Sequence, residues 1–144
     1  MSNVTLDQAS IIVDTAIAKG RELEFAPITI VVLDAGGHQV AMKRDDKSSL
    51  LRPQIAHGKA WGAIGMGLPG RKLRDRAQAN PAFFGALSDL AGGNMVCNPG
   101  GVLLHDQDGN LIGAVGASGD TGENDEICIV AGIEAAGLVA VTGE

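Results

Sequence analysis

Gly100–Glu126 has the sequence GGVLLHDQDGNLIGAVGASGDTGENDE and decides more about the fold than any other stretch of the chain. Apolar runs on either side of DQDG predict two strands joined by a tight turn. A glycine-rich loop follows and brings four carboxylates to the start of a helix: Asp120, Glu123, Asp125 and Glu126. Crowded like charges repel one another, so they need a counter-charge, a bound partner or water. Which of these three applies decides what the loop does.

A second predicted hairpin lies nearer the N-terminus and has a similar sequence. Ile28–Asp34 (ITIVVLD) and Gln39–Arg44 are its strands, and the turn sequence DAGG joins them. The preceding segment, Thr5–Glu24, has apolar residues at helical spacing. Gln8 lies three residues after Thr5, which is the pattern of a capping box. The chain is therefore expected to begin with a helix followed by a β-hairpin.

The rest of the chain predicts further helices and one short strand. Pro53 suits the first turn of a helix. The expected elements are helices over 53–66, 71–79 and 81–90, a strand at 95–97, and a last helix capped by Asn124 or Asp125 that ends near Gly137. With 71–79 and 81–90 counted together, the order is α-β-β-α-α-β-β-β-α. This order predicts an α+β fold, in which an antiparallel sheet of about five strands has helices packed on one side.

Composition narrows the class of protein. The chain has 144 residues, which suits one domain over residues 1–144. Its net charge of −6 argues against nucleic acid and anionic membranes as partners, and no apolar run approaches the ~20 residues that span a bilayer. The N-terminus lacks the basic start and apolar core of a signal peptide. Cys97 and Cys128 form no CxxC motif, so we expect reduced thiols in a cytoplasmic protein.

The acidic loop has three possible explanations. Asp120 and Glu123 suit capping of the last helix, where carboxylates interact favourably with the helix dipole and stay solvated. A metal site is the second explanation, but the histidines show no ligand spacing such as HxxxH, and no metal is predicted. The third is a ligand or catalytic site with Asp125 or Glu126 facing inward. Glu126 shares a helical face with Val130 and is expected to be the more buried, so it could move protons.

Several cations are candidate partners for these carboxylates. Arg44 ends the second strand, and Arg52, His57 and Lys59 lie in the first turns of the 53–66 helix or just before it. Lys59 either extends its ammonium to solvent along an apolar surface or is held inside for a carboxylate substrate or for Glu126. His57 is expected to pack on the helix surface with an exposed edge.

Four separated motifs, in this order, resemble one known family. They are Arg52–Leu73 (RPQIAHGKAWGAIGMGLPGRKL), Pro81–Leu87 (PAFFGAL), the Gly100–Glu126 stretch and Ala131–Leu138 (AGIEAAGL). The chain resembles the GlcG/HbpS-like family, which includes the C-terminal domain of PduO-type cobalamin adenosyltransferases. The resemblance extends from Thr5 to Leu138 and covers nearly the whole chain.

This resemblance implies a profilin-like α+β fold and self-association into dimers or larger rings. It also implies that haem or another tetrapyrrole is a possible ligand, because some members bind one. In the haem-binding members the iron ligand is a histidine of the N-terminal helical region, and Thr5–Glu24 contains no His and no Met. Haem would then need His38, His57, His105 or a Met, so the resemblance by itself assigns no cofactor.

Three hypotheses follow for the function. The first is a small-molecule-binding protein for a tetrapyrrole or a small organic acid, with its pocket between the sheet, the 53–66 helix and the 118–126 loop. Its expected ligand-binding residues are Arg44, Arg52, His57, Gly100, Gly101, Ser118 and Gly119. The second is a cofactor-independent catabolic enzyme with Glu126 as the proton-transfer group, Asp125 and Lys59 as further catalytic residues, and Arg44 or Lys59 as the substrate anchor. The third is a stabilising oligomeric partner without a ligand.

Overall fold

The computed structural model describes residues 2–144, and its elements alternate between hairpins and helices. They are α1 (Leu6–Glu22), β1 (Thr29–Asp34), β2 (Gln39–Arg44), α2 (Arg52–Met66), α3 (Gly70–Ala79), α4 (Pro81–Leu90), β3 (Gly101–His105), β4 (Leu111–Ser118), α5 (Gly122–Ala135) and β5 (Val139–Val141). The five strands form one antiparallel sheet in the order β2-β1-β4-β3-β5. The α+β class and the five-stranded antiparallel sheet are therefore confirmed.

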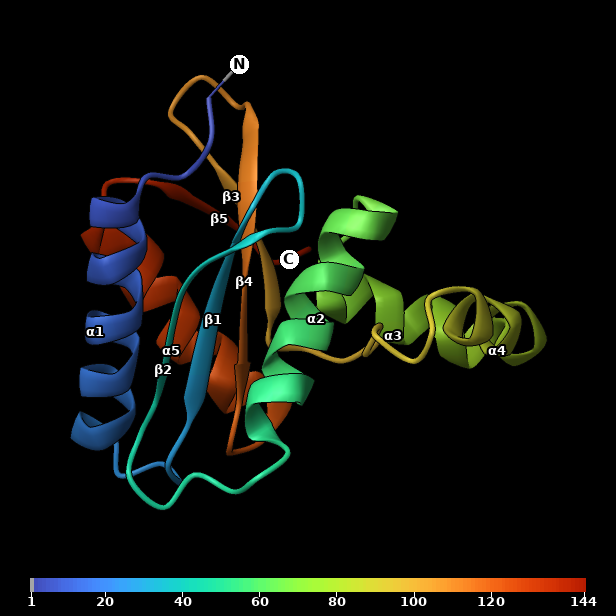
Figure 1. Ribbon diagram of the computed structural model, residues 1–144, viewed down its shortest axis with the longest axis horizontal. Coiled ribbons are helices and arrows are strands. Elements are labelled where there is room, and N and C mark those ends of the chain that lie inside the picture. Colours follow the sequence, from blue (N-terminus) through green and yellow to red (C-terminus); the bar gives the residue numbers. More distant parts are fainter. Residues whose placement is uncertain (1) are drawn as a thin grey trace.

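Helices cover both faces of this sheet, whereas the sequence analysis placed them on one. Figure 1 shows α1 and α5 on one side and α2 on the other. The reason lies in β1, which is buried along almost its whole length. Ile30 and Val32 belong to the core beneath α1 and α5, while Val31 and Leu33 pack against the alanines of α2. A continuous apolar strand of this kind needs cover on both faces.

The strands also differ from expectation in two respects. Met95–Cys97 joins no strand, because Met95 and Val96 pack against Gly62 and Gly58 of α2 instead. The fifth strand is β5, which pairs with β3 near the C-terminus. The first helix behaves as predicted: the side chains of Thr5 and Gln8 cap it reciprocally at 3.1 and 3.0 Å.

The start of α5 differs in detail from its prediction. The N-cap residue is Thr121 and not Asn124 or Asp125, because the Thr121 hydroxyl accepts a hydrogen bond from the Asn124 backbone amide at 3.1 Å. The helix therefore begins at Gly122, one turn earlier than expected. This earlier start places Asp125 and Glu126 within the first two turns, where Asp125 meets Lys59 of α2 and Glu126 meets Arg71 of α3.

Glycines allow α2 to lie unusually close to the sheet. A Cβ added at Gly116 of β4 would overlap the backbone carbonyl of Ala56, and one added at Gly101 of β3 would press on the backbone of Lys59. Small residues at these positions let the backbones of helix and strands touch. The close approach brings the side chain of Lys59 over the end of β4.

Three further features are the place of α3 and α4, the state of the two cysteines, and the character of the helices with respect to a membrane. Figure 1 shows α3 and α4 as an arm that extends away from the sheet. Cys97 and Cys128 are both free, and burial raises the pKa of the Cys128 thiol to about 11. Within residues 2–144, no helix combines the length and the apolar character needed to cross a bilayer.

Candidate functional site

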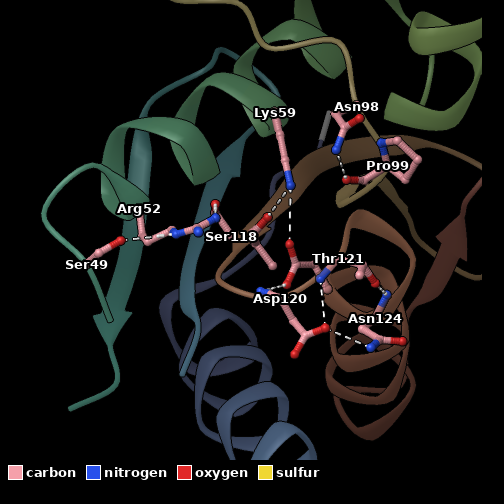
Figure 2. Close-up of polar contacts among 11 residues, drawn as sticks. Ser49, Arg52, Lys59, Asn98, Pro99, Ser118, Asp120, Thr121 and Asn124 are labelled. Carbon is pink, nitrogen blue, oxygen red and sulfur yellow. Dashed lines mark hydrogen bonds and ion pairs between the residues drawn. The ribbon is translucent and has the colours of Figure 1, made fainter. Parts of the chain in front are cut away.

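Lys59 and Asp125 form a buried ion pair at the centre of the predicted site. The Lys59 ammonium donates to the carbonyl oxygen of Ala117 at 2.9 Å and lies 3.3 Å from Asp125 Oδ2. The side chains are 4% and 0% exposed. Asp125 Oδ1 accepts from the backbone amide of Asp120 at 3.0 Å. Figure 2 shows Lys59 reaching from α2 down to the loop between β4 and α5, so the pair ties three elements together.

Burial sets the electrostatics of this pair. Burial lowers the pKa of the Lys59 ammonium, and the neighbouring carboxylate of Asp125 acts in the opposite direction. Gly100, with a φ of +105°, leaves room for the ammonium, because a Cβ there would lie 2.9 Å from Nζ. Gly100, Gly101, Lys59 and Asp125 were candidate residues of two separate hypotheses, and the structure brings the four together. The expectation that Glu126 is more buried than Asp125 is wrong.

Arg52 and Ser118 meet beside the ion pair. The guanidinium donates to the Ser118 hydroxyl at 3.0 Å and to the Ser49 hydroxyl at 3.2 Å. Ser118 is fully buried, and Gly119 lies against the backbone of Pro27. These contacts lie between the sheet, α2 and the 118–126 loop, where the first hypothesis placed its pocket.

The two outer carboxylates of the loop have structural partners. Asp120 accepts from the backbone amides of Ala26 (2.7 Å) and Thr121 (2.8 Å) and from the Asn124 side chain (2.8 Å). These hydrogen bonds hold the pKa of Asp120 below its usual range. Glu123 stays half exposed and pairs with Arg74 at 3.1 Å. Asp120 therefore fastens the loop to the segment before β1 and is not simply solvated as expected.

Glu126 has a different partner from any that the sequence indicated. Its Oε1 accepts from Arg71 Nη2 at 2.7 Å, and this contact raises the pKa of the guanidinium. Lys59 pairs with Asp125, and Arg44 donates to the Ser48 carbonyl at 2.9 Å, so neither proposed anchor contacts Glu126. Arg71 was missed because it lies in a charged segment, RKLRDR, where nothing marks one arginine as inward-facing.

At least three surface grooves are large enough for a small molecule, and one of them, of about 550 Å³ between α1 and β2, has Arg44 in its lining. The other two are considered further below. One of about 760 Å³ lies between α5, the start of α3 and the β5 segment, with Glu126 and Arg71 in its lining. The other, of about 550 Å³, lies where α2 begins, and His57 is in its lining. We call them the Glu126 groove and the His57 groove.

The His57 groove combines an imidazole with apolar and amide side chains. His57 is partly buried on α2. The apolar lining residues are Leu51, Pro53, Ile55 and Val96, and the amides are Gln39, Gln54 and Asn94. The other two histidines have different surroundings. His38 is 82% exposed beside Asp34, and His105 ends β3 next to a turn.

Comparison with known families matches residues 4–134 to the family described as haem degrading protein HbpS-like. The chain belongs to this family. The corrinoid adenosyltransferase PduO of Salmonella typhimurium is 33% identical over 76% of this chain, and the aligned part is 32% of the enzyme. The HbpS-like chain thus spans about a third of the length of that curated relative.

Solved structures of the HbpS-like fold overlay on nearly the whole chain. The crystal structure of a PduOC–heme complex has a TM-score of 0.86 and 26% identity, and it covers 97% of this chain and 99% of its own. The Klebsiella pneumoniae protein ORFY has a TM-score of 0.85 at 23% identity, covering 94% and 92%. At that identity the second likeness supports the fold alone. The family resemblance drawn from the sequence motifs is therefore confirmed.

Proposed function

We propose that this HbpS-like chain binds a tetrapyrrole in the His57 groove, with the His57 imidazole as the axial ligand of the metal. The observation that carries the proposal is the place of His57: it lies partly buried in a groove of about 550 Å³ with apolar walls. Neutral imidazole is a common ligand of iron and cobalt in proteins. The flat apolar face of a tetrapyrrole would cover Leu51, Ile55 and Val96, and the metal would accept a nitrogen ligand there.

The donor set of the groove favours a corrinoid over haem. Haem carries propionates, which proteins usually pair with Arg or Lys, and none of the described residues in this lining is Arg or Lys. The amides of Gln39, Gln54 and Asn94 can instead exchange hydrogen bonds with the neutral amide side chains at the edge of a corrin ring. The likeness to a PduOC–heme complex over 97% of this chain supports a tetrapyrrole as the ligand class.

His57→Ala should weaken binding of aquacobinamide, a corrinoid without its own lower base, by at least about 10- to 100-fold. The measurement is an absorbance titration, in which nitrogen coordination shifts the corrinoid bands. His38→Ala is the matched control, because His38 is exposed and outside the groove, and it should bind like the wild type. Hemin titrated in parallel should bind more weakly. Equal affinity of the His57→Ala and wild-type proteins would contradict the proposal.

The charge of the Glu126 groove argues against an organic acid as its ligand. The Glu126 groove has one guanidinium, from Arg71, and four carboxylates, from Glu123, Glu126, Glu134 and Glu144. An anionic ligand would be repelled by this excess of negative charge. Proton transfer by Glu126 would also need a substrate anchor other than Arg44 or Lys59. We therefore do not place a small organic acid in the Glu126 groove.

We also propose that α4 is the surface through which two copies associate. This helix is largely apolar in sequence (PAFFGALSDL), yet Phe84 is its one buried residue. Phe83 and Leu90 are 51% and 85% exposed. Apolar side chains gathered on a projecting arm are typical of a protein–protein contact. A second copy is the occupant that fits, because it brings the same apolar helix.

Replacing both Phe83 and Leu90 with Ser should shift the protein from oligomer to monomer in sedimentation velocity. The melting temperature of the monomer should change little, since both side chains are exposed within one chain. Ala82→Ser, a polar substitution at another exposed position of α4, should keep the wild-type sedimentation coefficient. A double variant that stays oligomeric would show that the contact lies elsewhere.

A further inference from the structure

Two residues that line the Glu126 groove, Glu126 and Arg71, each have a buried polar atom without a partner within residues 2–144. Glu126 has a side chain only 8% exposed, and it uses Oε1 for the 2.7 Å contact with Arg71 Nη2. Its second oxygen, Oε2, has no hydrogen-bond partner within residues 2–144. The same is true of Arg71 Nε. Native proteins leave few buried polar atoms unpaired, so each such atom calls for an explanation.

The chemistry of the two atoms defines the missing partner. Arg71 Nε is a donor and needs an acceptor, while the ionised Glu126 carboxylate needs a donor. An ammonium group could donate to Glu126 but has no acceptor for Arg71 Nε. A carboxylate could serve Arg71 but would face four carboxylates in the same lining. A hydroxyl group accepts one hydrogen bond and donates another, and it carries no charge.

The walls of the groove suit an apolar body attached to that hydroxyl. Ile127, Val130, Leu138 and Val139 line it alongside the charged residues. Glu144 lies at the rim with a side chain 73% exposed, 3.6 Å from Arg71, and can move without disturbing the core. We propose that the Glu126 groove is a binding site for small uncharged alcohols, with the ligand hydroxyl between Arg71 Nε and Glu126 Oε2. This site is separate from the His57 groove and does not depend on tetrapyrrole binding.

The test is an NMR titration with three probes that share one apolar body: isobutanol, isobutyrate and isobutylammonium. The readout is the side-chain Nε–H resonance of Arg71, which reports directly on the unpartnered donor. Isobutanol should move this resonance with saturation, and the two charged probes should not. Glu126→Gln should raise the dissociation constant of isobutanol about tenfold, because one charge-assisted hydrogen bond is weakened.

Two surface variants separate binding from folding. Val130→Phe adds bulk to the groove wall at a partly exposed position and should abolish the isobutanol shift at an unchanged melting temperature. Ile11→Phe makes the same kind of change at an exposed position on α1 and should leave the shift intact. The proposal is overturned if isobutanol produces no saturable shift. It is also overturned if the Arg71 resonance shows contact with a resident water that isobutanol does not displace.

Discussion

Asp125→Ala should destabilise the protein by about 3–5 kcal/mol, because it leaves the Lys59 ammonium buried without its counter-charge. Both residues are buried, so bulk solvent does not reach the ammonium to replace the lost carboxylate. The substitution also removes the acceptor for the Asp120 backbone amide. For a chain of this length, we expect the melting temperature to fall by on the order of 10 °C, measured by calorimetry or circular dichroism.

Glu123→Ala is the matched control, because it removes a carboxylate from the same loop. Glu123 is exposed and its ion pair with Arg74 lies at the surface, so the change in stability should be below about 1 kcal/mol. The double variant Lys59→Met with Asp125→Leu should recover part of the loss, since apolar side chains of similar size need no partner. If Asp125→Ala were as mild as Glu123→Ala, the pair would not hold α2, β4 and α5 together as described.

Gly116→Ala should cost roughly 3 kcal/mol or more, because its Cβ would overlap the carbonyl oxygen of Ala56. Both groups belong to backbone, so no flexible side chain can move aside. The helix α2 would have to retreat from β4, which would pull Lys59 away from Ala117 and Asp125. Chemical denaturation should therefore show a lower unfolding midpoint.

Gly65→Ala provides the comparison for this prediction within α2 itself. A Cβ at Gly65 meets no atom within 4 Å, so the substitution adds no clash and raises helix propensity. It should stabilise the protein by up to about 1 kcal/mol. Similar effects of the two alanines would mean that α2 and β4 are not in backbone contact.

The sequence was sufficient for those elements whose signals are local. The capping box of Thr5 and Gln8 marks the first helix, and the two turn sequences mark the hairpins that became β1–β2 and β3–β4. It was not sufficient where pairing is long-range. Val139–Val141 forms a strand by pairing with the free edge of β3. A segment of three residues is too short for its own sequence to predict this pairing. Met95–Cys97 has strand-like composition but packs on the glycines of α2 instead.

The structure brings several candidate site residues together, but their pairing was not predicted. The positions of Lys59, Asp125 and the glycines at 100 and 101 follow from the hairpin and helix assignments. Asp125 and Glu126 are neighbours on α5 but point to different sides of it, toward Lys59 and Arg71. The pairing therefore depends on the exact rotation of this helix about its axis. The helix begins after Thr121, its N-cap residue. The sequence did not single out Thr121, because Asn124 and Asp125 nearby are also residue types that cap helices. The nearly continuous apolar sequence of β1, which the structure buries, was the available sign that helices would cover both faces of the sheet.

These pairings change how the acidic loop relates to function. Asp120 and Asp125 hold the loop in place, and Glu123 lies at the surface with Arg74. Only Glu126 combines a buried carboxylate with an unpaired oxygen in a groove. Our proposed ligand sites therefore lie outside this loop's buried ion pair, in the Glu126 groove and in the His57 groove.

The most direct test of the tetrapyrrole proposal is electron paramagnetic resonance of reduced cobinamide bound to the protein. An axial imidazole nitrogen splits each cobalt line into a triplet. We predict this triplet for the wild-type protein, a doublet when its histidines carry nitrogen-15, and neither in His57→Ala. A spectrum without nitrogen splitting, or a triplet that survives in His57→Ala, would contradict the assignment of His57 as the metal ligand.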